Sequence, residues 1–318
     1  MRIAVVVPVW NGRRWLEGLF DSLDAQQRRP DAIIAVDNGS TDGSVAWLRE
    51  RGGIEVIELG ENTGFAVAAN RGIAAAQGCD AVALVNTDVE LAGDWLARLA
   101  ARLEDEPRCA SVACKMVDLA DPNVLYDTGN FLRRDGVCEQ RGRFHADDGR
   151  FDEAGEVWGA CAGAALYRRD AVLDAGGFDA RYFAYIEDVD LALRLRMAGW
   201  GCAYEPAVAR HAGSGSSDQL RRPVATLVER NTVALVARAF PWRWAPMVLY
   251  RQVAWGVHAA RSGGLRDYLR GLAAGLALAP AMWRERRALR ALPVAVADAV
   301  PPRPWRGPEA GGHPRSSR

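Results

Sequence analysis

The hydrophobic residues of the first hundred positions fall into short runs separated by segments of helical pattern. The runs lie at residues 3–7 (IAVVV), 32–37 (AIIAVD), 54–59 (IEVIEL) and 81–86 (AVALVN). Their lengths suit buried β-strands, and the amphipathic segments between them predict helices. Strands and helices in alternation are typical of βαβ units, so we expect an α/β fold around a mostly parallel sheet.

Polar side chains follow each of the four predicted strands. In open α/β sheets the carboxyl ends of parallel strands form the crevice that binds ligands. We therefore expect these polar residues to meet at one edge of the sheet. They are Pro8, Trp10 and Asn11 after the first strand, Asp37 and Asn38 after the second, Asn62 and Gly64 after the third, and Asn86, Thr87 and Asp88 after the fourth.

Residues 184–200 (AYIEDVDLALRLRMAGW) predict a helix with three carboxylates in its first turn, those of Glu187, Asp188 and Asp190. Apolar residues repeat at helical spacing, and Gly199 stands where a left-handed cap belongs. The exposed N–H groups and the helix dipole favour one or two acids there. Three acids repel one another unless a cation, a proton or a basic partner is near. The cluster is therefore either a helix start or a functional site.

The rest of the chain divides into regions of different character. Residues 107–160 are less regular, and we interpret them as the far half of the sheet with a mobile loop at about 140–155. Residues 236–300 have the pattern of basic, tryptophan-bearing helices, and the proline- and glycine-rich residues 301–318 predict a disordered tail. We expect one large domain over residues 1–235, followed by the helical extension and the tail.

The formal net charge of the 318 residues is zero, but the charge is unevenly distributed. Residues 1–235 contain 36 acidic and 26 basic residues, whereas residues 236–300 contain three acidic residues and ten arginines. This asymmetry indicates different partners for the two parts. The six cysteines form no CxxC pair, so the sequence indicates neither a zinc knuckle nor a disulfide framework. Free cysteines are typical of a reduced, cytoplasmic compartment. The first apolar run, ended by Pro8, is too short for a secretory signal peptide.

The basic region is a candidate membrane contact. Its apolar run at residues 272–283 is twelve residues long, whereas a helix that spans a membrane needs about 20. Arginine-rich helices with tryptophans suit the surface of an anionic membrane. The tryptophans are Trp242, Trp244, Trp255 and Trp283. A helical pair packed on the large domain, or a dimer contact, is the alternative.

The order of motifs resembles that of family-2 glycosyltransferases of the GT-A fold, and most closely their rhamnosyltransferase-like branch. The motifs are PVWN, VDNGSTD, NTGFAVAAN, VNTD, GAALYRR and EDVDL with a later GW, and they cover roughly residues 1–235. The resemblance implies a mixed, mostly parallel sheet and inverting, metal-dependent transfer of a sugar from a nucleotide diphosphate. It implies a cell-surface polysaccharide or lipid-linked glycan as acceptor. The basic region 236–300, by its composition, would place the enzyme at the inner face of the cell membrane. Membership of the rhamnosyltransferase-like branch would make rhamnose the transferred sugar. The resemblance leaves open whether the protein forms a homo-oligomer, and it implies no nucleic-acid partner.

The resemblance also implies roles for single residues. Asp88 is the metal-binding acid of an Asp-X-Asp-like triplet whose first member is here Asn86. His211, ahead of a Gly/Ser-rich loop expected to close on the donor, is a further ligand of Mn²⁺ or Mg²⁺. Asp188 is the catalytic base, with Glu187 and Asp190 orienting it or the acceptor. Donor binding falls to Pro8, Trp10, Asn11, Asp37, Asn38, Asn62, Gly64, Asn70, Arg71, Asn86, Thr87 and Asp88, and acceptor binding to Trp158, Gly163 and Asp190.

Ordinary alternatives stand beside these roles. Trp10 could simply be packed, Asp37 could start a turn, and Arg71 could be solvated. A sugar nucleotidyltransferase shares the α/β nucleotide fold, but it normally has a glycine-rich basic loop where this chain has PVWNGRR. A non-catalytic scaffold with a decayed site is a second alternative, which the complete set of expected acids argues against.

Overall fold

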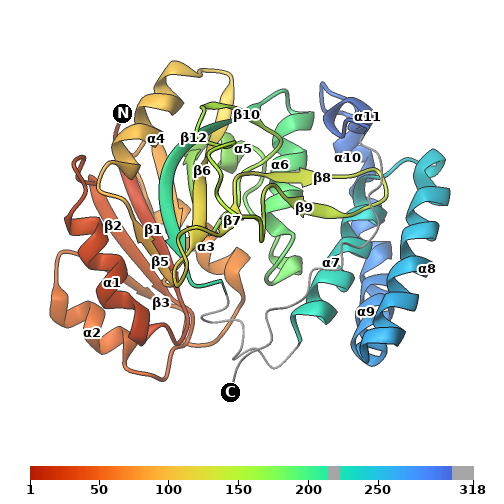
Figure 1. Ribbon diagram of the computed structural model, residues 1–318, viewed down its shortest axis with the longest axis horizontal. Helices are drawn as coiled ribbons and strands as arrows, with labels where there is room; N and C mark the ends of the chain where they lie inside the picture. The colour runs from red at the N-terminus through yellow and green to blue at the C-terminus, as the bar shows by residue number, and fades with distance from the viewer. Residues whose placement is uncertain (214–222, 303–318) are drawn as a thin grey trace.

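A mixed sheet forms the centre of the molecule (Figure 1). The computed structural model describes residues 1–213 and 223–302, and within them ten strands form this sheet in the order β10-β12-β6-β11-β4-β1-β2-β3, with β5 paired to β12 and β7 to β6. The first four strands are parallel neighbours: β1 (Ile3–Val9), β2 (Ala32–Asp37), β3 (Glu55–Glu58) and β4 (Ala81–Val85). This confirms the strands predicted from the apolar runs.

The far half of the sheet contains antiparallel pairs. Its strands are β5 (Val89–Leu91), β6 (Cys109–Asp118), β7 (Leu125–Asp127), β10 (Gly155–Val157), β11 (Ala164–Arg168) and β12 (Gly201–His211), and a separate hairpin pairs β8 (Asn130–Leu132) with β9 (Cys138–Gln140). β11 runs antiparallel to both β4 and β6, so it joins the two halves. In the segment after β9, Asp147 and Asp152 pair with the buried Lys115 of β6 at 2.6 and 2.5 Å.

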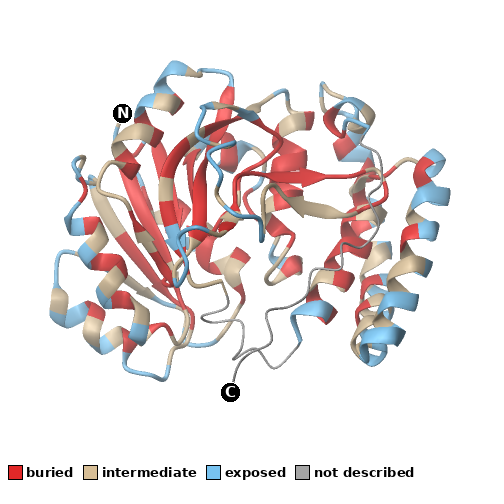
Figure 2. Ribbon diagram, viewed as in Figure 1, coloured by how far each residue is buried: buried red, intermediate tan, exposed pale blue. Residues whose placement is uncertain are grey.

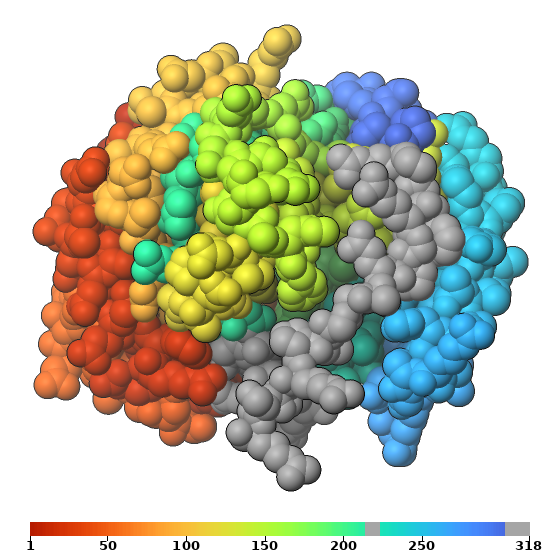
Figure 3. Space-filling view, in the orientation of Figure 1, coloured from red at the N-terminus to blue at the C-terminus, as the bar shows by residue number. Residues whose placement is uncertain are grey.

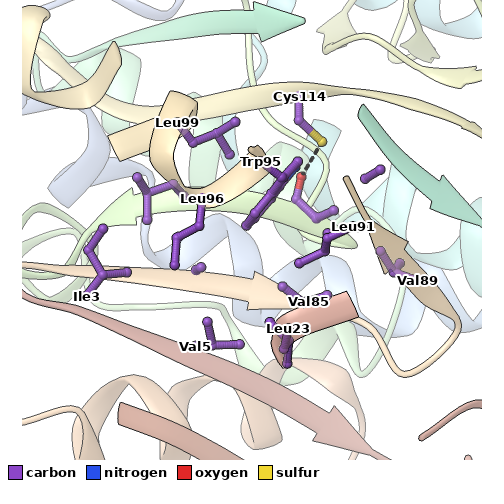
Figure 4. Packing of buried hydrophobic residues seen from close by; sticks show 14 of the residues in the cluster. Ile3, Val5, Leu23, Val85, Val89, Leu91, Trp95, Leu96, Leu99 and Cys114 are labelled. Carbon is purple, nitrogen blue, oxygen red and sulfur yellow. Dashed lines mark hydrogen bonds between the residues drawn. The ribbon is translucent and has the colours of Figure 1, made fainter. Parts of the chain in front are cut away.

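Helices cover both faces of the sheet because successive side chains of a strand point to opposite faces. They are α1 (Arg13–Asp24), α2 (Ser44–Arg51), α3 (Phe65–Ala75), α4 (Trp95–Asp105), α5 (Arg169–Asp174) and α6 (Glu187–Met197). Val5 and Val7 share a hydrophobic cluster with α1, α2 and α4, whereas Ala4 and Val6 share one with α3, α5 and α6. Figure 4 shows Val5 among the buried side chains Leu23 of α1 and Leu96 of α4. Figure 2 shows buried residues concentrated in the strands and the inner helix faces.

The C-terminal helices pack on this domain. They are α7 (Val224–Ala239), the 3₁₀ turn η3 (Trp242–Trp244), α8 (Ala245–Ser262), α9 (Leu265–Arg284), α10 (Arg286–Arg290) and α11 (Val296–Ala299). The boundary predicted at residue 235 falls inside α7, and one hydrophobic cluster joins Leu193 of α6 to Leu235 and Met282. A Cβ on Gly275 of α9 would lie 2.6 Å from that of Val233, so glycine permits the close approach of α9 to α7.

Two sequence-based expectations concern the C-terminal region: that its helices do not cross a membrane, and that residues 301–318 form a disordered tail. In residues 1–213 and 223–302, every helix is too short or too polar to cross a membrane. The predicted tail lies outside the described residues from position 303 onward.

Candidate active site

The loops that follow β1 and β2 are joined by hydrogen bonds. The N–H of Asn11 donates to Oγ of Ser40 (2.9 Å), and the N–H of Thr41 donates to Oδ1 of Asn11 (2.8 Å). The Asp37 carboxylate accepts from the N–H groups of Gly39 (3.0 Å) and Ser40 (3.1 Å). Asp37 therefore shapes the turn, as its ordinary alternative expected. A carboxylate has room for about four donors, so this role is compatible with a further contact to a ligand.

The loop after β3 connects the expected donor side to the acidic helix. Oδ1 of Asn38 accepts from the N–H of Thr63 (2.8 Å), and Oδ1 of Asn62 accepts from the N–H of Gly64 (3.0 Å). Gly64 has φ +90°, and a Cβ there would lie 2.5 Å from the carbonyl oxygen of Phe183. Only glycine permits this approach, which brings the loop against the turn that precedes α6.

Asp88 and His211 meet from two different strands. Oδ1 of Asp88, three residues after β4, lies 3.3 Å from Nε2 of His211 at the end of β12. Both side chains are buried, and within the described residues this Nε2 has no hydrogen-bond partner. A carboxylate oxygen beside an unpaired imidazole nitrogen fits a divalent cation. The two residues assigned to a metal are thus brought together by the fold.

The surroundings of His211 add a condition to this fit. Nδ1 of His211 accepts a hydrogen bond from the N–H of Gly213 (3.1 Å). Ligation through Nε2 requires the ring proton on Nδ1, so this hydrogen bond would have to open. In residues 1–213 and 223–302, no group of three His, Cys, Asp or Glu side chains forms a metal cluster. The Gly/Ser-rich loop expected to close on the donor lies outside the described residues from position 214 to 222.

Asp188 lies in the first turn of α6 and is partly exposed. Its Oδ2 accepts hydrogen bonds from Nδ2 of Asn130 (3.0 Å) and from the N–H of Ala162 (3.3 Å). Burial of the carboxyl raises the pKa of Asp188, and the hydrogen bonds oppose that rise. A carboxylate that is held in place and has a raised pKa suits a general base.

Glu187 is 7% exposed, and in the described part of the chain its Oε2 has no hydrogen-bond partner. Burial, followed by the charge of Asp188, raises the pKa of Glu187 well above its ordinary value. A proton on this carboxyl removes one negative charge from the turn. The three neighbouring acids therefore need not all be ionised.

Asp190 is completely buried and binds other side chains of the protein. It accepts hydrogen bonds from the hydroxyl of Tyr182 (3.1 Å), Nε of Arg194 (2.8 Å) and Nη1 of Arg238 (2.8 Å). Arg238 belongs to α7, so Asp190 anchors α6 to α7. With 0% of its surface exposed, Asp190 cannot contact an acceptor in this structure, which corrects its predicted acceptor role.

The turn before α6 has an unusual backbone. Three non-glycine residues have φ between +66° and +70°, namely Phe183, Tyr185 and Ile186. Such values are costly, particularly for a β-branched residue. The buried Asn231 of α7 stabilises the turn, since its Nδ2 donates to the carbonyl oxygens of Tyr182 (2.9 Å), Ala184 (2.8 Å) and Tyr185 (2.7 Å). The surrounding structure therefore imposes the position of Glu187 and Asp188.

Some residues predicted to bind ligands have partners within the protein. Nε1 of the buried Trp158 donates to the carbonyl oxygen of Ala299 (2.7 Å), so Trp158 packs under the C-terminal segment, and its acceptor role stays a prediction. Asn70 holds Phe178 through two hydrogen bonds, of 2.7 and 2.8 Å. Arg71 is exposed, as its solvated alternative expected.

The other predicted residues lie at the strand ends. The N–H of Asn86 donates to the carbonyl oxygen of Gly163 (2.8 Å), which joins the ends of β4 and β11 beside Asp88. Thr87 is buried against the start of α1, where a Cβ on Gly12 would lie 2.8 Å from its Oγ1. Pro8 and Trp10 are half-buried at the end of β1.

Sequence reasoning missed two groups that the fold brings to Asp188. Asn130 of β8 contacts it directly. Asp127 of β7 is 1% exposed, and burial raises its pKa to about 6, with a smaller contribution from Asp188. Both lie in the irregular stretch YDTGN. A polar turn sequence was the only signal there, and nothing in its spacing relates it to residue 188.

The comparisons with known proteins agree with this architecture. Residues 4–175 match the family described as Glycosyl transferase family 2. The chain is 28% identical over 269 residues to an N-acetylglucosaminyl-diphospho-decaprenol L-rhamnosyltransferase of Mycobacterium tuberculosis, covering 77% of this chain and 87% of the relative. It is 23% identical to the O-antigen chain rhamnosyltransferase RfbN of Salmonella typhimurium, covering 66% of each.

A solved structure gives the same fold. The crystal structure of GalNAc-T7 with UDP, GalNAc and Mn²⁺ superposes with a TM-score of 0.64 at 15% identity, covering 80% of this chain and 51% of the other. The chain therefore spans about half the length of that protein. The sheet and the site define a glycosyltransferase of the GT-A fold. The chain belongs to glycosyl transferase family 2, and it resembles the rhamnosyltransferases of that family.

Proposed function

We propose that this family-2 glycosyltransferase transfers a sugar from a nucleotide-diphosphate donor to a hydroxyl of a lipid-linked or cell-surface glycan, with inversion at the anomeric carbon. The observation that carries the proposal is the position of Asp188, a partly exposed carboxylate with a raised pKa that Asn130 and Ala162 hold in place. Rhamnose is our first choice of sugar, because the two rhamnosyltransferase relatives named above match 77% and 66% of this chain.

In the proposed reaction Asp188 takes the proton of the acceptor hydroxyl. The acceptor oxygen then forms a bond to the anomeric carbon, while the bond from that carbon to the diphosphate oxygen breaks on the opposite side. The diphosphate leaves with the bonding electron pair. The raised pKa of Asp188 makes its carboxylate a stronger base than that of an ordinary aspartate.

The donor would lie along the carboxyl ends of β1 to β4. Asn11, Asp37 and Asn38 shape the loops that would hold the nucleoside. Gly64 keeps the loop after β3 against the turn that presents Asp188. Asp88 and His211 would hold Mn²⁺ or Mg²⁺. When bound, such a cation neutralises charge on the diphosphate leaving group.

We also propose that the enzyme works at the inner face of the cell membrane. The name of the mycobacterial relative describes an acceptor linked to decaprenol through a diphosphate. A lipid of that kind stays in the bilayer, so an enzyme that uses it gains from residing at the same surface. The basic C-terminal helices are the region of this chain suited to such contact.

Thermal-shift measurements with dTDP-, UDP- and GDP-sugars, each with and without Mn²⁺, test donor binding. The expected result is a rise of Tm with one nucleotide sugar that depends on Mn²⁺, followed by release of the nucleoside diphosphate on prolonged incubation. A protein that binds the donor but never releases the diphosphate, with any acceptor tried, would favour the non-catalytic scaffold. Absence of any shift would contradict the proposed donor class.

A further inference from the structure

Most of the large apolar side chains at the surface lie on the C-terminal helices. Of the thirteen that are exposed in residues 1–213 and 223–302, ten lie between Trp242 and Trp283. Leu249, Val253 and Val257 recur at every fourth position of α8, with exposed fractions of 66, 60 and 45%, and therefore form one stripe. An exposed apolar surface of this extent marks an interaction site. We call the ten exposed apolar side chains of η3, α8 and α9 the apolar face. They are Trp242, Met247, Leu249, Tyr250, Val253, Val257, Leu265, Leu269, Leu276 and Trp283.

The charged side chains exposed around the apolar face have one sign. Between residues 240 and 290, the exposed charged residues of the structure are all arginines. The two acids of this range, Asp267 and Glu285, are half-buried, and Glu285 pairs with Arg238 of α7 at 2.7 Å. Arg251 points inward and pairs with Glu229 at 3.1 Å. The outer side of α8 is therefore apolar, and arginines border it.

An arginine-lined hollow adjoins the apolar face. Trp283, Arg284, Arg286, Arg287 and Arg290 line a space of about 380 Å³ where α9 meets α10. The Arg286 guanidinium lies over the ring of Trp283 at 4.0 Å, is only 6% exposed, and pairs with no carboxylate of the described residues. Burial and the charge of Arg290 lower the pKa of Arg286.

The hollow is suited to an anion from outside the described chain. A buried guanidinium without a counter-ion is costly, and an anionic group beside it would offset that cost. The ring of Trp283 also lies 5.3 Å from that of the exposed Trp242. The two aromatic rings thus connect the arginine-lined hollow to the apolar face.

We propose that the apolar face and the arginine-lined hollow dock the enzyme on an anionic phospholipid bilayer, with a lipid phosphate held among Arg284, Arg286, Arg287 and Arg290. Apolar side chains would enter the boundary between headgroups and acyl chains, while arginines contact phosphates. α8 and α9 form one flank of the molecule (Figure 3), so a flat surface can reach them. The inference deepens the proposed function, because it assumes an acceptor carried by the membrane.

Charge argues against two other occupants of this surface. A second copy packed through the same face would bring arginines opposite arginines, and that face offers no exposed carboxylate within residues 240–290 to pair with them. The chain's own C-terminal residues 303–318 contain four arginines and one glutamate, so they carry the same sign. A bilayer rich in phosphate groups has the complementary charge.

Co-sedimentation of the full-length protein with vesicles tests the proposal. Vesicles of phosphatidylglycerol and phosphatidylcholine at low salt should bind the protein at least about tenfold better than vesicles of phosphatidylcholine alone. The double variant Leu249→Ser/Val253→Ser and the triple variant Arg284→Gln/Arg287→Gln/Arg290→Gln should each lose about tenfold or more in binding. Phe144→Ser and Arg108→Gln change exposed residues elsewhere on the chain and should bind as the wild type does.

Several outcomes would overturn the docking. They are equal binding to both kinds of vesicle, wild-type binding by the two multiple variants, or a dimer in sedimentation velocity that Leu249→Ser/Val253→Ser dissociates. A thermal shift with inorganic phosphate in a protein that binds no vesicle would assign the hollow to a soluble anion instead. Mn²⁺-dependent donor binding in the same variants should equal that of the wild type. Loss of donor binding with intact vesicle binding would count against the proposed function alone.

Discussion

Nδ2 of Asn231 lies 2.7 Å from the carbonyl oxygen of Tyr185, so a buried residue of α7 holds the turn that positions Asp188. Asn231→Asp keeps the size of the side chain but replaces its donor by an acceptor facing carbonyl oxygens. We expect a loss of about 1–3 kcal/mol in the free energy of unfolding. We also expect kcat to fall by about tenfold or more with little change in donor KM, because the base is displaced while the donor loops remain.

A control on the same helix separates positioning from stability. Thr226→Val removes the hydrogen bond from Oγ1 of Thr226 to the carbonyl oxygen of Asp267 (3.1 Å), which joins α7 to α9. It should lower Tm but keep kcat. Equal kcat losses in both variants, after correction for the folded fraction, would make Asn231 a structural residue only.

Asp188→Asn removes the proposed base with almost no change in size. We expect turnover to fall by about 10² to 10⁴, while Mn²⁺-dependent donor binding in a thermal-shift assay persists. Glu187→Gln should cost less turnover. Near-normal turnover in Asp188→Asn together with complete loss in Glu187→Gln would transfer the role of base to Glu187.

Asn130→Ala should change the pH dependence of turnover. The hydrogen bond from Asn130 stabilises the ionised form of Asp188 and so lowers its pKa. Without that bond the pKa rises further, and because the base acts when ionised, the acidic limb of the kcat–pH profile should move to higher pH. Asn123→Ala, in an exposed loop, is the control and should leave the profile in place. An unchanged profile in Asn130→Ala would mean that the acidic limb does not report the ionisation of Asp188.

Asp88→Ala and His211→Ala should both weaken the stabilisation that Mn²⁺ confers in the presence of a nucleoside diphosphate. The expected loss of metal affinity is about 10- to 100-fold or more for each, because the two side chains would share one ion. Titration of Mn²⁺ with Tm as the readout measures it without an activity assay. Full activity after exhaustive treatment with EDTA would contradict the requirement for a cation.

Glu187→Gln should stabilise the protein at neutral pH. Because the pKa of Glu187 is raised on folding, the folded state binds more protons than the unfolded state between the two pKa values, and stability falls as pH rises through that window. The variant lacks this loss. Its Tm should match the wild type near pH 4 and exceed it by about 2–4 °C near pH 8. Glu153→Gln, an exposed control, should show no such trend. If the difference in Tm between the variant and the wild type shrinks as pH rises, the prediction is wrong.

Local pattern was sufficient for the first half of the fold and for the place where the polar strand ends gather. The apolar runs ending near Val9, Asp37, Glu58 and Val85 are strands, because a buried parallel strand needs a short continuous apolar sequence. Their polar ends gather at one edge because parallel strands share a direction. The acidic helix and its cap at Gly199 follow from residues within one turn of each other.

The partners of individual side chains depend on tertiary packing. Asp190 looked like a member of a functional acid cluster, but Arg238, 48 positions later, folds onto it and buries it. Asn130 reaches Asp188 across 58 positions, and His211 reaches Asp88 from another strand. Periodicity reports which way a side chain faces relative to its own element. It carries no information on which distant residue the chain brings to the same place, so those contacts were decided only when the sheet and α7 packed together.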